Sequence, residues 1–579
     1  MALDPYFHEY ISRLKDGVAR TSALGRLSDW LVKHTTLKGQ PYSFDGHTFQ
    51  KALLDEKHPD VCVIKPSQVG LSETVARLTL GFLAVQTGST AIYTLPTVNE
   101  ALRFVKARVD PVIDGSKYLK GIMSSGNDSS SFKRIGGSNF YAVGTWGRDL
   151  ISIDADIVCC DEVDSSNPVV LKSVESRLLH SRFKHEELGV RGIRRYLSTP
   201  SVTGVGISAM FERSDKRRRL VRCRHCTHWF HPNFLENFVV QGFDRPFSSL
   251  TVEDVMDLDD RGLIETTKLL CPSCHNEVTL SNLGDEYREW VAENPSVTSF
   301  RGYLVSPLDI PDYHTPISIL RSRIRYGAEE SQFYNYTLGL PYDSSSNSIS
   351  AEAVKQNTVL SPVFPGNPIS GAVLGLDVGK TSWITVAKPV RVNGVTELHV
   401  LWAEQVRVEG DNLYTTVIER IKQFGVVRAV VDSAPYFDTI IRIQAALPEG
   451  FVLPCSYTLT DRKLPSYLVN ENTWTVAANR TKCFDLLAKN INTGKIKFAE
   501  FPEVKTFAGH LQNIKRIERR EDGELVNESW IKVGSGGDHY AHSLGYAAIA
   551  AQMISAGEYI NFAPLPSVRE AFVGKNYQE

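Results

Sequence analysis

The chain lacks any long hydrophobic run. Its 579 residues include no apolar segment that approaches the roughly 18 to 20 residues needed to span a bilayer. The opening segment, MALDPYFHEYISRLKDG, also has no apolar core of the kind that marks a secretory signal. We therefore expect a cytoplasmic protein with no membrane-spanning segment.

A strong net charge is absent as well. Lysine and arginine total 64, aspartate and glutamate total 66, and the formal net charge is −2. This balance excludes a wholly basic nucleic-acid coat protein and a polyacidic tail, although it is compatible with a local basic groove. With 42% hydrophobic and 22% charged residues, the composition is that of a globular protein without extensive disorder. The length favours about three to four domains.

Cysteine is scarce and odd in number, which argues against a disulfide framework. Four of the nine cysteines form two C-x2-C pairs, Cys223 with Cys226 and Cys271 with Cys274. Two such turns supply the four thiolates of a closed tetrahedral site, and a closed site indicates structural Zn²⁺. The alternative is a set of thiols left over from a lost site. Four nearby histidines are competing ligands, although four thiolates suffice: His225, His228, His231 and His275.

Strand and helix patterns divide the chain into two α/β regions. Between about 60 and 200, apolar strands alternate with amphipathic helices, as in a parallel sheet covered on both faces. A segment rich in Ser, Pro, Gly and Asn then marks a linker, after which strand patterns return. The predicted parts are an N-terminal helical arm (1–40), an α/β domain (41–340) with a cysteine insert at about 216–285, the linker (341–370), a second α/β domain (371–558) and a C-terminal tail (559–579).

The segment VCVIKPSQVGLSET (61–74) predicts a strand, a short loop and a helix. This is the layout of a P-loop, in which backbone N–H groups and a helix N-terminus bind phosphate. The usual lysine next to Ser/Thr is missing, and Lys65 at the strand end can supply the cation across the loop. Ser72 is placed to hold Mg²⁺. A purely structural turn is the alternative. The predicted ATP contacts in this segment are Lys65, Gln68, Gly70, Leu71 and Ser72.

The strand IVCCDE (157–162) ends in two acidic residues. Asp161 can hold the Mg²⁺ shell, and Glu162 can orient or deprotonate the attacking water. The alternative is a solvated acidic turn. A further strand ends in Ser198 and Thr199, and this end resembles the coupling motif with which helicase-like motors sense the γ-phosphate.

Other residues have two open interpretations each. Tyr42 fits either stacking on adenine or a buried core position. Arg148 fits either charge stabilisation during phosphoryl transfer or a surface salt bridge. The basic lead-in to the first cysteine pair fits either contact with DNA phosphate or a solvated charge run; it comprises Lys216, Arg217, Arg218, Arg219, Arg222 and Arg224.

Three aspartates mark a second acidic site. Asp377 and Asp432 each end an apolar strand of the second α/β domain. Asp538 and His542 are four residues apart, which places them on one face of a helix. Three clustered carboxylates can hold two Mg²⁺ or Mn²⁺ ions about 4 Å apart, as phosphodiester hydrolysis by two metals requires. The alternatives are strand-end caps or turns for each aspartate, with an Asx role for Asp538.

Together these motifs resemble the large terminase subunit of tailed bacteriophages, in its lambda-type (GpA-like) branch. The lysine-first loop, the DE-ended strand, the cysteine insert, the C-terminal acidic site and YNYTLGLPYDSSS (334–346) carry the resemblance, over roughly residues 40 to 555. It implies a P-loop ATPase domain of the RecA/ASCE type with a zinc-binding insert, followed by an RNase H-like nuclease domain. One departure is His542, which stands where some members have Asp, so that Asp538, His542 or both can be the third nuclease ligand.

The resemblance also implies a function. Such proteins use ATP to translocate double-stranded DNA into a procapsid, and they cut concatemeric DNA with a metal-dependent endonuclease. The implied ligands are ATP, Mg²⁺ or Mn²⁺ and structural Zn²⁺, and the implied location is the host cytoplasm. The implied partners are double-stranded DNA, a small terminase subunit, the portal protein and further copies of the chain in a ring. A DNA-repair helicase–nuclease is an alternative that needs a second motor domain, and a DDE-type transposase is one that has no use for a P-loop.

Overall fold

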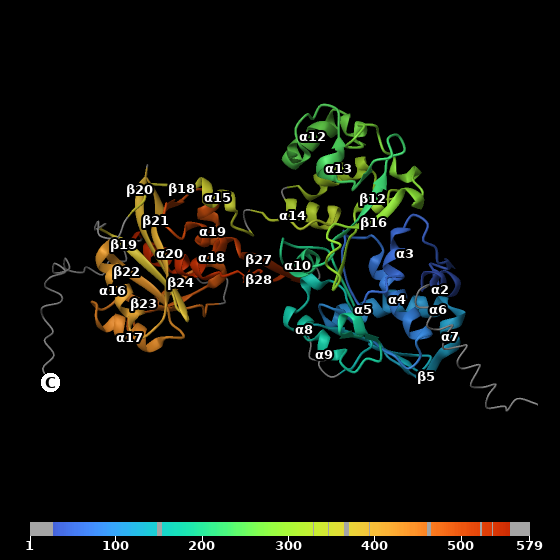
Figure 1. Ribbon diagram of the computed structural model, residues 1–579, viewed down its shortest axis with the longest axis horizontal. Coiled ribbons are helices and arrows are strands. Elements are labelled where there is room, and N and C mark those ends of the chain that lie inside the picture. The colour runs from blue at the N-terminus through green and yellow to red at the C-terminus, as the bar shows by residue number, and fades with distance from the viewer. Residues whose placement is uncertain are drawn as a thin grey trace, which may run out of the picture. The chain divides into compact units, whose positions relative to one another are not determined.

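The computed structural model describes residues 27–146, 153–327, 329–344, 347–363, 370–392, 394–459, 465–521, 524–534 and 536–555. The chain divides between Tyr342 and Asp343 into two compact units, here called unit 1 and unit 2 (Figure 1). Arg148 and the predicted C-terminal tail (559–579) lie outside the described residues. None of the described helices combines the length and the apolar character needed to cross a membrane.

A mostly parallel sheet of eleven strands forms the middle of unit 1. β3 (Asp60–Ile64) lies between β17 (Arg301–Leu304) and β11 (Ile193–Ser198) and pairs in parallel with both. β11 also pairs in parallel with β8 (Ile157–Cys160). The strand ends that carry the predicted ATP motifs therefore lie at one edge of three adjacent strands. The other strands are β12 (Arg217–Arg222), β13 (Trp229–Phe230), β16 (Arg288–Ala292), β4 (Thr90–Leu95), β7 (Ser138–Gly144), β6 (Phe132–Ile135) and β5 (Met123–Asp128).

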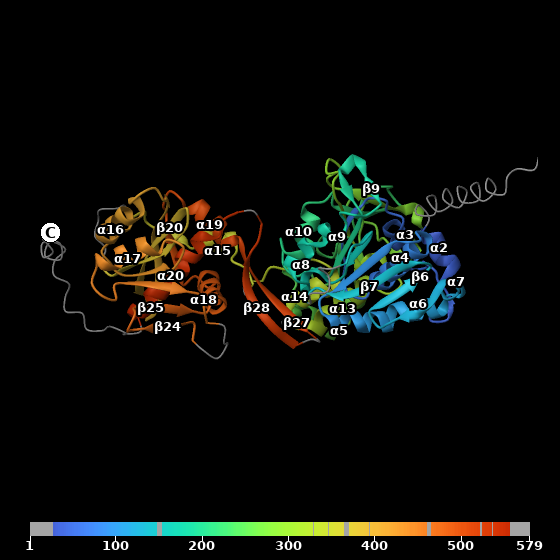
Figure 2. The same cartoon turned by 90° about the horizontal axis from the view of Figure 1, so that it is seen from below.

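Helices cover both faces of this sheet. On one face, α4 (Leu71–Val85) and α2 (Leu27–His34) share a buried apolar cluster with the strands. On the other face, α10 (Gly206–Glu212) belongs to a second buried cluster. The remaining helices are α3 (Phe49–Leu54), α5 (Val98–Phe104), α6 (Asp110–Gly115), α7 (Lys117–Ile122), α8 (Pro168–Lys172) and α9 (Val174–Arg177). In Figures 1 and 2, α8, α9 and α10 group together, apart from α2, α6 and α7.

The cysteine-containing segment builds a small core of its own at one edge of the sheet. Its buried residues include Phe230, Phe234, Val255 and Leu258, and Cys223 and Cys271 belong to the same apolar cluster. Side chains from α13 (Pro316–Tyr326) complete this cluster. The segment contains α11 (Phe234–Asn237), β14 (Phe238–Val239), α12 (Val252–Asp260) and β15 (Lys268–Leu269).

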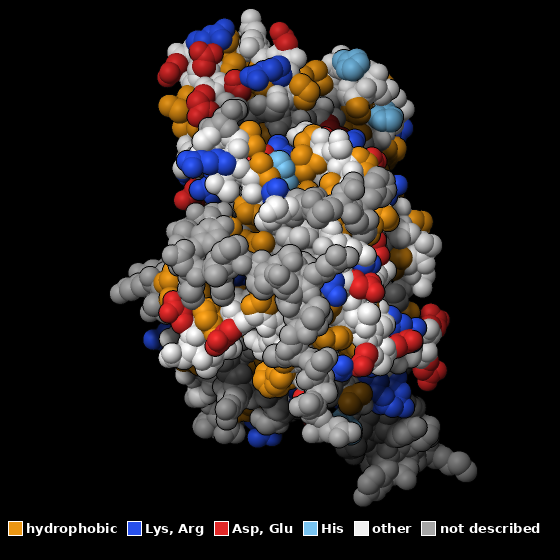
Figure 3. All heavy atoms as spheres, turned by 90° about the vertical axis from the view of Figure 1, so that its left-hand side faces the viewer, with side chains coloured by type: hydrophobic (Ala, Val, Ile, Leu, Met, Phe, Trp, Pro, Cys, Tyr) orange, Lys and Arg blue, Asp and Glu red, His pale blue; other side chains and the backbone are white. Residues whose placement is uncertain are grey.

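The basic residues of β12 are engaged inside unit 1. The Arg217 guanidinium lies 2.7 Å from the carboxylate of Asp215, and that of Arg218 lies 3.0 Å from Glu293. Arg219 is only 5% exposed. Arg217 and Arg218 therefore pair with carboxylates within unit 1, and Arg219 is buried. On the face shown in Figure 3, Lys and Arg side chains of the described residues are interspersed with Asp and Glu.

Unit 2 contains a nine-stranded sheet of mixed direction. Its central strand, β19 (Ala372–Asp377), pairs antiparallel with β20 (Thr381–Val392) and parallel with β22 (Val426–Asp432). β20 pairs antiparallel with β21 (Val395–Arg407), and β22 pairs parallel with β23 (Val452–Ser456). The outer strands are β18 (Thr358–Leu360), β26 (Ile496–Ala499), β25 (Thr475–Ala478) and β24 (Tyr467–Asn470), and a separate hairpin comprises β27 (Ile514–Glu521) and β28 (Glu524–Lys532).

One helix lies directly on the central strand of this sheet. A Cβ at Gly375 would come within 1.9 Å of the carbonyl oxygen of Ser543, so only glycine lets α20 (His539–Ser555) approach β19 so closely. α20 shares this face with α18 (Arg480–Asn492) and α19 (Val504–Gln512). α16 (Asn412–Phe424) and α17 (Phe437–Ala445) cover the other face. Because side chains alternate along β19, Val373 in the cluster beneath α20 places Asp377 on the α20 face as well.

The predicted linker differs from the structure. Part of segment 341–370 forms α15 (Ala351–Gln356), which begins at the N-cap Ser350. β18 follows it and pairs in parallel with β26. The sequence does not predict this edge strand for two reasons. The segment is rich in Ser and Pro, and a strand of three residues is too short to show a periodic pattern. The unit boundary therefore lies at the start of the predicted linker, and residues 358–360 of that segment belong to the sheet of unit 2.

Candidate functional site

The loop between β3 and α4 has the backbone shape of a phosphate-binding turn. Gly70 is the N-cap of α4 and has a φ of 76°, while Gln68 has a φ of 61°. The side-chain amide of Gln50 donates to the carbonyl oxygen of Val69 (3.1 Å). A Cβ at Gly70 would lie 3.0 Å from that same amide nitrogen. Gln50 therefore fixes the position of the loop. The loop leads directly into the N-terminus of α4, a 15-residue helix whose first backbone N–H groups are free to bind an anion.

Lys65 and Glu162 form the charged centre of this site. Lys65 Nζ lies 3.1 Å from Glu162 Oε1, and their side chains are 7% and 39% exposed. Burial disfavours the charged lysine, but attraction by Glu162 and Asp161 outweighs it and raises the pKa of Lys65. Desolvation raises the pKa of Glu162, and Lys65 only partly opposes this. The early lysine and the acidic strand end, far apart in sequence, are therefore one pair.

Asp161 is held by a residue that the sequence motifs do not reveal. It is 1% exposed, and one of its carboxylate oxygens accepts a hydrogen bond from Tyr93 Oη (2.8 Å). The other accepts from the backbone N–H of Glu162 (3.0 Å). Tyr93 itself is stacked on Phe104, with ring centroids 4.1 Å apart. The sequence of β4, TAIYTL, does not single out Tyr93, because two threonines of the strand also carry hydroxyl groups.

The adenine-stacking hypothesis for Tyr42 is wrong. Its side chain is 4% exposed, and the Arg77 guanidinium lies 4.6 Å from the ring centroid. Phe44 packs edge-on at 5.2 Å. Tyr42 Oη donates to Gln50 (3.2 Å), so the tyrosine supports the residue that holds the phosphate loop. Burial also raises the pKa of Tyr42.

The remaining predicted residues of this site fall into two groups. Leu71 is 1% exposed and packs in the core, so only its backbone is available to a phosphate, whereas Ser72 lies in the first turn of α4. Ser198 is fully buried, and its carbonyl oxygen accepts from the N–H of Lys65 (3.1 Å). Thr199 is 9% exposed. The predicted coupling residues thus lie beside the start of the phosphate loop.

The four predicted cysteines come together in unit 1. Their sulfur atoms all lie within 4.8 Å of one another. Cys223 Sγ lies 3.8 Å from Cys274 Sγ, and Cys226 Sγ lies 3.6 Å from Cys271 Sγ. Zn–S bonds of about 2.3 Å in a tetrahedron place sulfur atoms roughly 3.8 Å apart, so the spacing fits this ion. In the described part of the chain, no other three His, Cys, Asp or Glu side chains come this close together.

The two cysteine turns are built alike. The N–H of Thr227 donates to the carbonyl of Cys223, and the N–H of His275 donates to that of Cys271, both at 2.9 Å. Thr227 and His275 each have a positive φ, of 63° and 55°. Hydrogen bonds from the backbone and side chain of Asn276 lower the pKa of Cys274 to about 6, whereas burial raises the pKa of Cys271 to about 11. The two turns therefore share one backbone geometry.

The acidic residues of unit 2 converge at one edge of its sheet. Leu376 is the register partner of Val431, so Asp377 and Asp432 end neighbouring parallel strands. Burial, together with the negative charge of Asp377, raises the pKa of Asp432 to about 6. Two carboxylates that crowd each other in this way fit a divalent cation, which favours their ionised forms.

Two histidines of α20 pair with aspartates at this edge. His542 Nε2 lies 3.4 Å from Asp538 Oδ2. Burial alone would raise the pKa of Asp538, but the hydrogen bond and charge of His542 lower it to about 2. His539, which the sequence reasoning missed, lies 2.8 Å from Asp377 Oδ2 through Nδ1, and this contact raises the pKa of His539. α20 thereby carries Asp538 and His542 to the edge that Asp377 occupies.

Part of unit 1 is similar to a known protein family. Residues 39–287 match the model of the phage terminase large subunit gpA, ATPase domain. The matched segment lies within unit 1 and is similar to this ATPase domain. The matched residues include the loop between β3 and α4, Asp161 and Glu162, and both cysteine turns. The curated proteins contain no match to the chain.

Solved structures of large terminases are similar to most of the chain. That of bacteriophage HK97 is 12% identical, with a TM-score of 0.46, and the match covers 90% of this chain and 98% of that one. That of a thermophilic bacteriophage is 13% identical, with a TM-score of 0.29, over 89% and 100% of the two chains. The large terminase nuclease of phage G20c, with bound zinc, is 15% identical, with a TM-score of 0.22, over 34% and 95%.

The cysteine cluster of unit 1 gives a test by metal removal. We expect about one Zn²⁺ per chain, lost in Cys223→Ser or Cys271→Ser together with more than about 2 kcal/mol of unfolding free energy. The matched control is His225→Ala, which leaves four thiolates and should keep the metal. Metal analysis and thermal unfolding check both. A stable Cys223→Ser variant with the zinc content of the wild type would remove the metal site.

A glycine beside the phosphate loop gives a second test. Gly339 has a φ of 68°, and a Cβ there would lie 2.7 Å from the nitrogen of Pro66. Gly262 has a φ of 70° with nothing within 4 Å of its Cβ position. Both alanine variants carry the left-handed cost of roughly 1 to 2 kcal/mol. We expect Gly339→Ala alone to weaken ATP binding as well, by about tenfold, because it displaces the loop. Equal ATP affinity in the two variants would contradict this.

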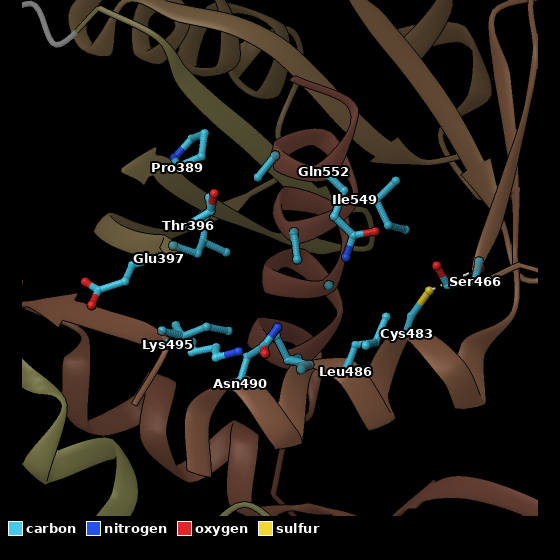
Figure 4. Close-up of a pocket in the computed structure, with 16 residues that line it drawn as sticks. Pro389, Thr396, Glu397, Ser466, Cys483, Leu486, Asn490, Lys495, Ile549 and Gln552 are labelled. Atoms are coloured by element: carbon cyan, nitrogen blue, oxygen red, sulfur yellow. Dashed lines mark hydrogen bonds between the residues drawn. The ribbon is translucent and has the colours of Figure 1, made fainter. Parts of the chain in front are cut away.

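A cavity of about 200 Å³ also opens in unit 2 (Figure 4). Leu486 and Asn490 of α18 and Ile549 and Gln552 of α20 line it, and a hydrogen bond joins Cys483 Sγ to the carbonyl oxygen of Ser466 (3.5 Å). The part of α20 that lines the cavity begins after the first turn of the helix. The cavity is therefore separate from the carboxylate edge.

Proposed function

We propose that the chain is a large terminase subunit: an ATP-driven motor that moves double-stranded DNA into a procapsid and cuts concatemeric DNA. The single observation that carries the motor is the pair of Lys65 and Glu162 beside a phosphate loop, inside a domain of the gpA terminase family. The partners of this proposal are double-stranded DNA, a small terminase subunit, the portal and other copies of the chain in a ring. The host cytoplasm is the proposed location.

ATP hydrolysis follows from the exchange of one ion pair. Lys65 is neutralised by Glu162 when no phosphate is bound, and a γ-phosphate competes for the same ammonium group. When Lys65 shifts to the phosphate, Glu162 is released as a carboxylate whose raised pKa suits it to take a proton from the attacking water. Mg²⁺ supplies charge neutralisation on the phosphates, and Asp161 and Ser72 are the residues placed to hold it. Gln68 and Gly70 supply the backbone turn.

DNA cleavage is assigned to the carboxylate edge of unit 2. The strand order β21-β20-β19-β22-β23, with β20 antiparallel to its neighbours, supports an RNase H-like sheet. Carboxylate oxygens are the ligands that Mg²⁺ and Mn²⁺ prefer, and this edge offers them from Asp377, Asp432 and Asp538. Such ions supply an activated water and stabilise the leaving oxygen. His542 orients Asp538 and is the alternative ligand.

The cysteine cluster is proposed as a structural Zn²⁺ site. Four sulfurs leave no open position for a substrate. Cys223 and Cys271 are fully buried within the small core of the insert, so an ion there would hold that core together. This assigns the metal to folding of the ATPase domain and not to chemistry.

One pair of assays tests the proposed function. The full chain should hydrolyse ATP faster when double-stranded DNA is present, and it should cut plasmid DNA when Mn²⁺ is supplied. A helicase–nuclease would in addition unwind a duplex, and a transposase would cleave without ATPase activity. A chain that neither hydrolyses ATP nor cleaves plasmid would contradict the proposal.

A further inference from the structure

We propose that Asp164 is a positioning residue for ATP hydrolysis, which fixes the loop after Ser198 and Thr199 relative to Glu162. This inference rests on the ATPase function proposed above. Asp164 follows Glu162 by two residues and lies outside every motif considered in the sequence. It ends no strand and holds no nucleotide contact in the proposal so far.

The Asp164 carboxylate is saturated by one loop. Its Oδ2 accepts hydrogen bonds from the backbone N–H (2.8 Å) and the hydroxyl (2.6 Å) of Ser201. Its Oδ1 accepts from the N–H of Ile207 (2.7 Å). The N–H of Asp164 donates to Ser198 Oγ (3.2 Å). One residue thus binds both ends of the loop 199–206 and the last residue of the strand before it.

The loop is shaped to admit this carboxylate. Gly206, which begins α10, has a φ of 52°, and a Cβ there would lie 2.3 Å from Asp164 Oδ1. Burial raises the pKa of Asp164 to about 6, and its three hydrogen bonds act against that rise. A carboxylate this enclosed sets the distance between the ends of β8 and β11, because neither the loop nor the helix start can move without breaking its bonds.

The same loop is tied to the phosphate loop from its other side. The carbonyl oxygen of Ser201 accepts from Asn335 Nδ2 (2.8 Å) and from the N–H of Tyr342 (3.0 Å). The N–H of Ser67, in the phosphate loop, donates to the carbonyl oxygen of Tyr336 (2.8 Å). The hydrogen bonds of Asp164 therefore belong to a series of contacts that connects the acidic end of β8 to the phosphate loop through Ser201 and segment 335–342. Through these contacts, a movement of Glu162 during hydrolysis is transmitted to β11, the strand that ends in Ser198.

A split between kcat and KM tests this role in the full chain. Asp164→Asn replaces one acceptor oxygen by an amide that faces an N–H or O–H donor, and Asp164→Ala removes all three acceptor contacts. We expect kcat for ATP to fall about tenfold to a hundredfold, as for a misplacement of about 1 Å. KM should stay within about threefold, because the phosphate loop and Lys65 are intact. Ser201→Ala removes one contact and should lower kcat by only about two- to fivefold.

Asp215→Asn is the matched control. Asp215 is also fully buried, and it accepts from Arg217, Arg301 and the N–H of Gly302, away from the acidic strand end. It should lose thermal stability while its kcat, measured where the variant is folded, stays near that of the wild type. Wild-type kcat in folded Asp164→Asn and Ser201→Ala would overturn the role, as would equal kcat losses in Asp164→Asn and Asp215→Asn. A wild-type chain that does not hydrolyse ATP would instead refute the proposed function.

Discussion

Replacing Lys65 with alanine is expected to reduce ATP turnover at least about a hundredfold, because it removes the cation beside the phosphate loop. Lys65 is buried, and its ammonium group lies 3.1 Å from the carboxylate of Glu162. Its loss leaves no ammonium group at the end of β3 to take up the γ-phosphate charge. Steady-state hydrolysis, with and without double-stranded DNA, is the measurement. DNA cleavage by unit 2 should survive in this variant.

Two further variants sharpen that result. Glu162→Gln should still bind ATP, because it frees Lys65 from its ion pair, but its turnover should fall about 10² to 10⁴-fold with the loss of the proton acceptor. Lys133→Ala is the matched control, since Lys133 is also buried and lies 2.9 Å from Asp110. It should lower stability and spare turnover. Near wild-type hydrolysis by Lys65→Ala and Glu162→Gln would refute the assignment of both residues.

We expect Asp377→Ala and Asp432→Ala each to reduce plasmid cleavage at least about a hundredfold. Each variant removes one of the two carboxylates that would bind the same metal ion from neighbouring strand ends. Burial, together with the negative charge of Asp377, raises the pKa of Asp432 to about 6, so the two carboxylates lie close enough to bind one ion together. Asp538→Ala should have the same effect. His542→Ala should only weaken cleavage if His542 orients Asp538 without touching the metal.

The control for this series is Asp411→Ala. Asp411 is an exposed carboxylate of the same unit, and it lies 2.7 Å from Arg442 in a surface ion pair. Surface pairs contribute little to stability, so the variant should fold and cut DNA as the wild type does. DNA-stimulated ATPase should be unchanged across the whole series. Loss of ATPase in Asp377→Ala would point to unfolding and not to a missing ligand.

Strand ends were the most predictable part of the molecule. Lys65, Asp161 and Asp377 each follow or end an apolar run that the structure places in a sheet. Buried parallel strands have unbroken apolar sequences, and the polar residue at the carboxyl end is then conspicuous. The cysteine pairs were predictable for a similar reason, since a C-x2-C spacing already fixes a tight turn.

Partners supplied by a distant element could not be predicted. Tyr93 holds Asp161 from another strand, and nothing in its own segment gives the register of β4 on β8. His539 reaches Asp377 only because α20 docks on β19 where Gly375 leaves room. Tyr42 was ambiguous in sequence, and Arg77 decided its position by covering one face of the ring. In each case tertiary packing, which has no local periodic signal, determined the contact.

The most direct test measures both activities on one preparation of Asp377→Ala, with Mn²⁺, plasmid and ATP supplied. The proposal places ATP hydrolysis in unit 1 and DNA cleavage in unit 2, with different residues for each. Asp377→Ala should therefore lose only DNA cleavage. We predict DNA-stimulated ATP hydrolysis at the wild-type rate and no plasmid cleavage above the metal-free background. Undiminished cleavage by this variant would contradict the two-metal nuclease, because the aspartates at the strand ends of unit 2 would then be structural.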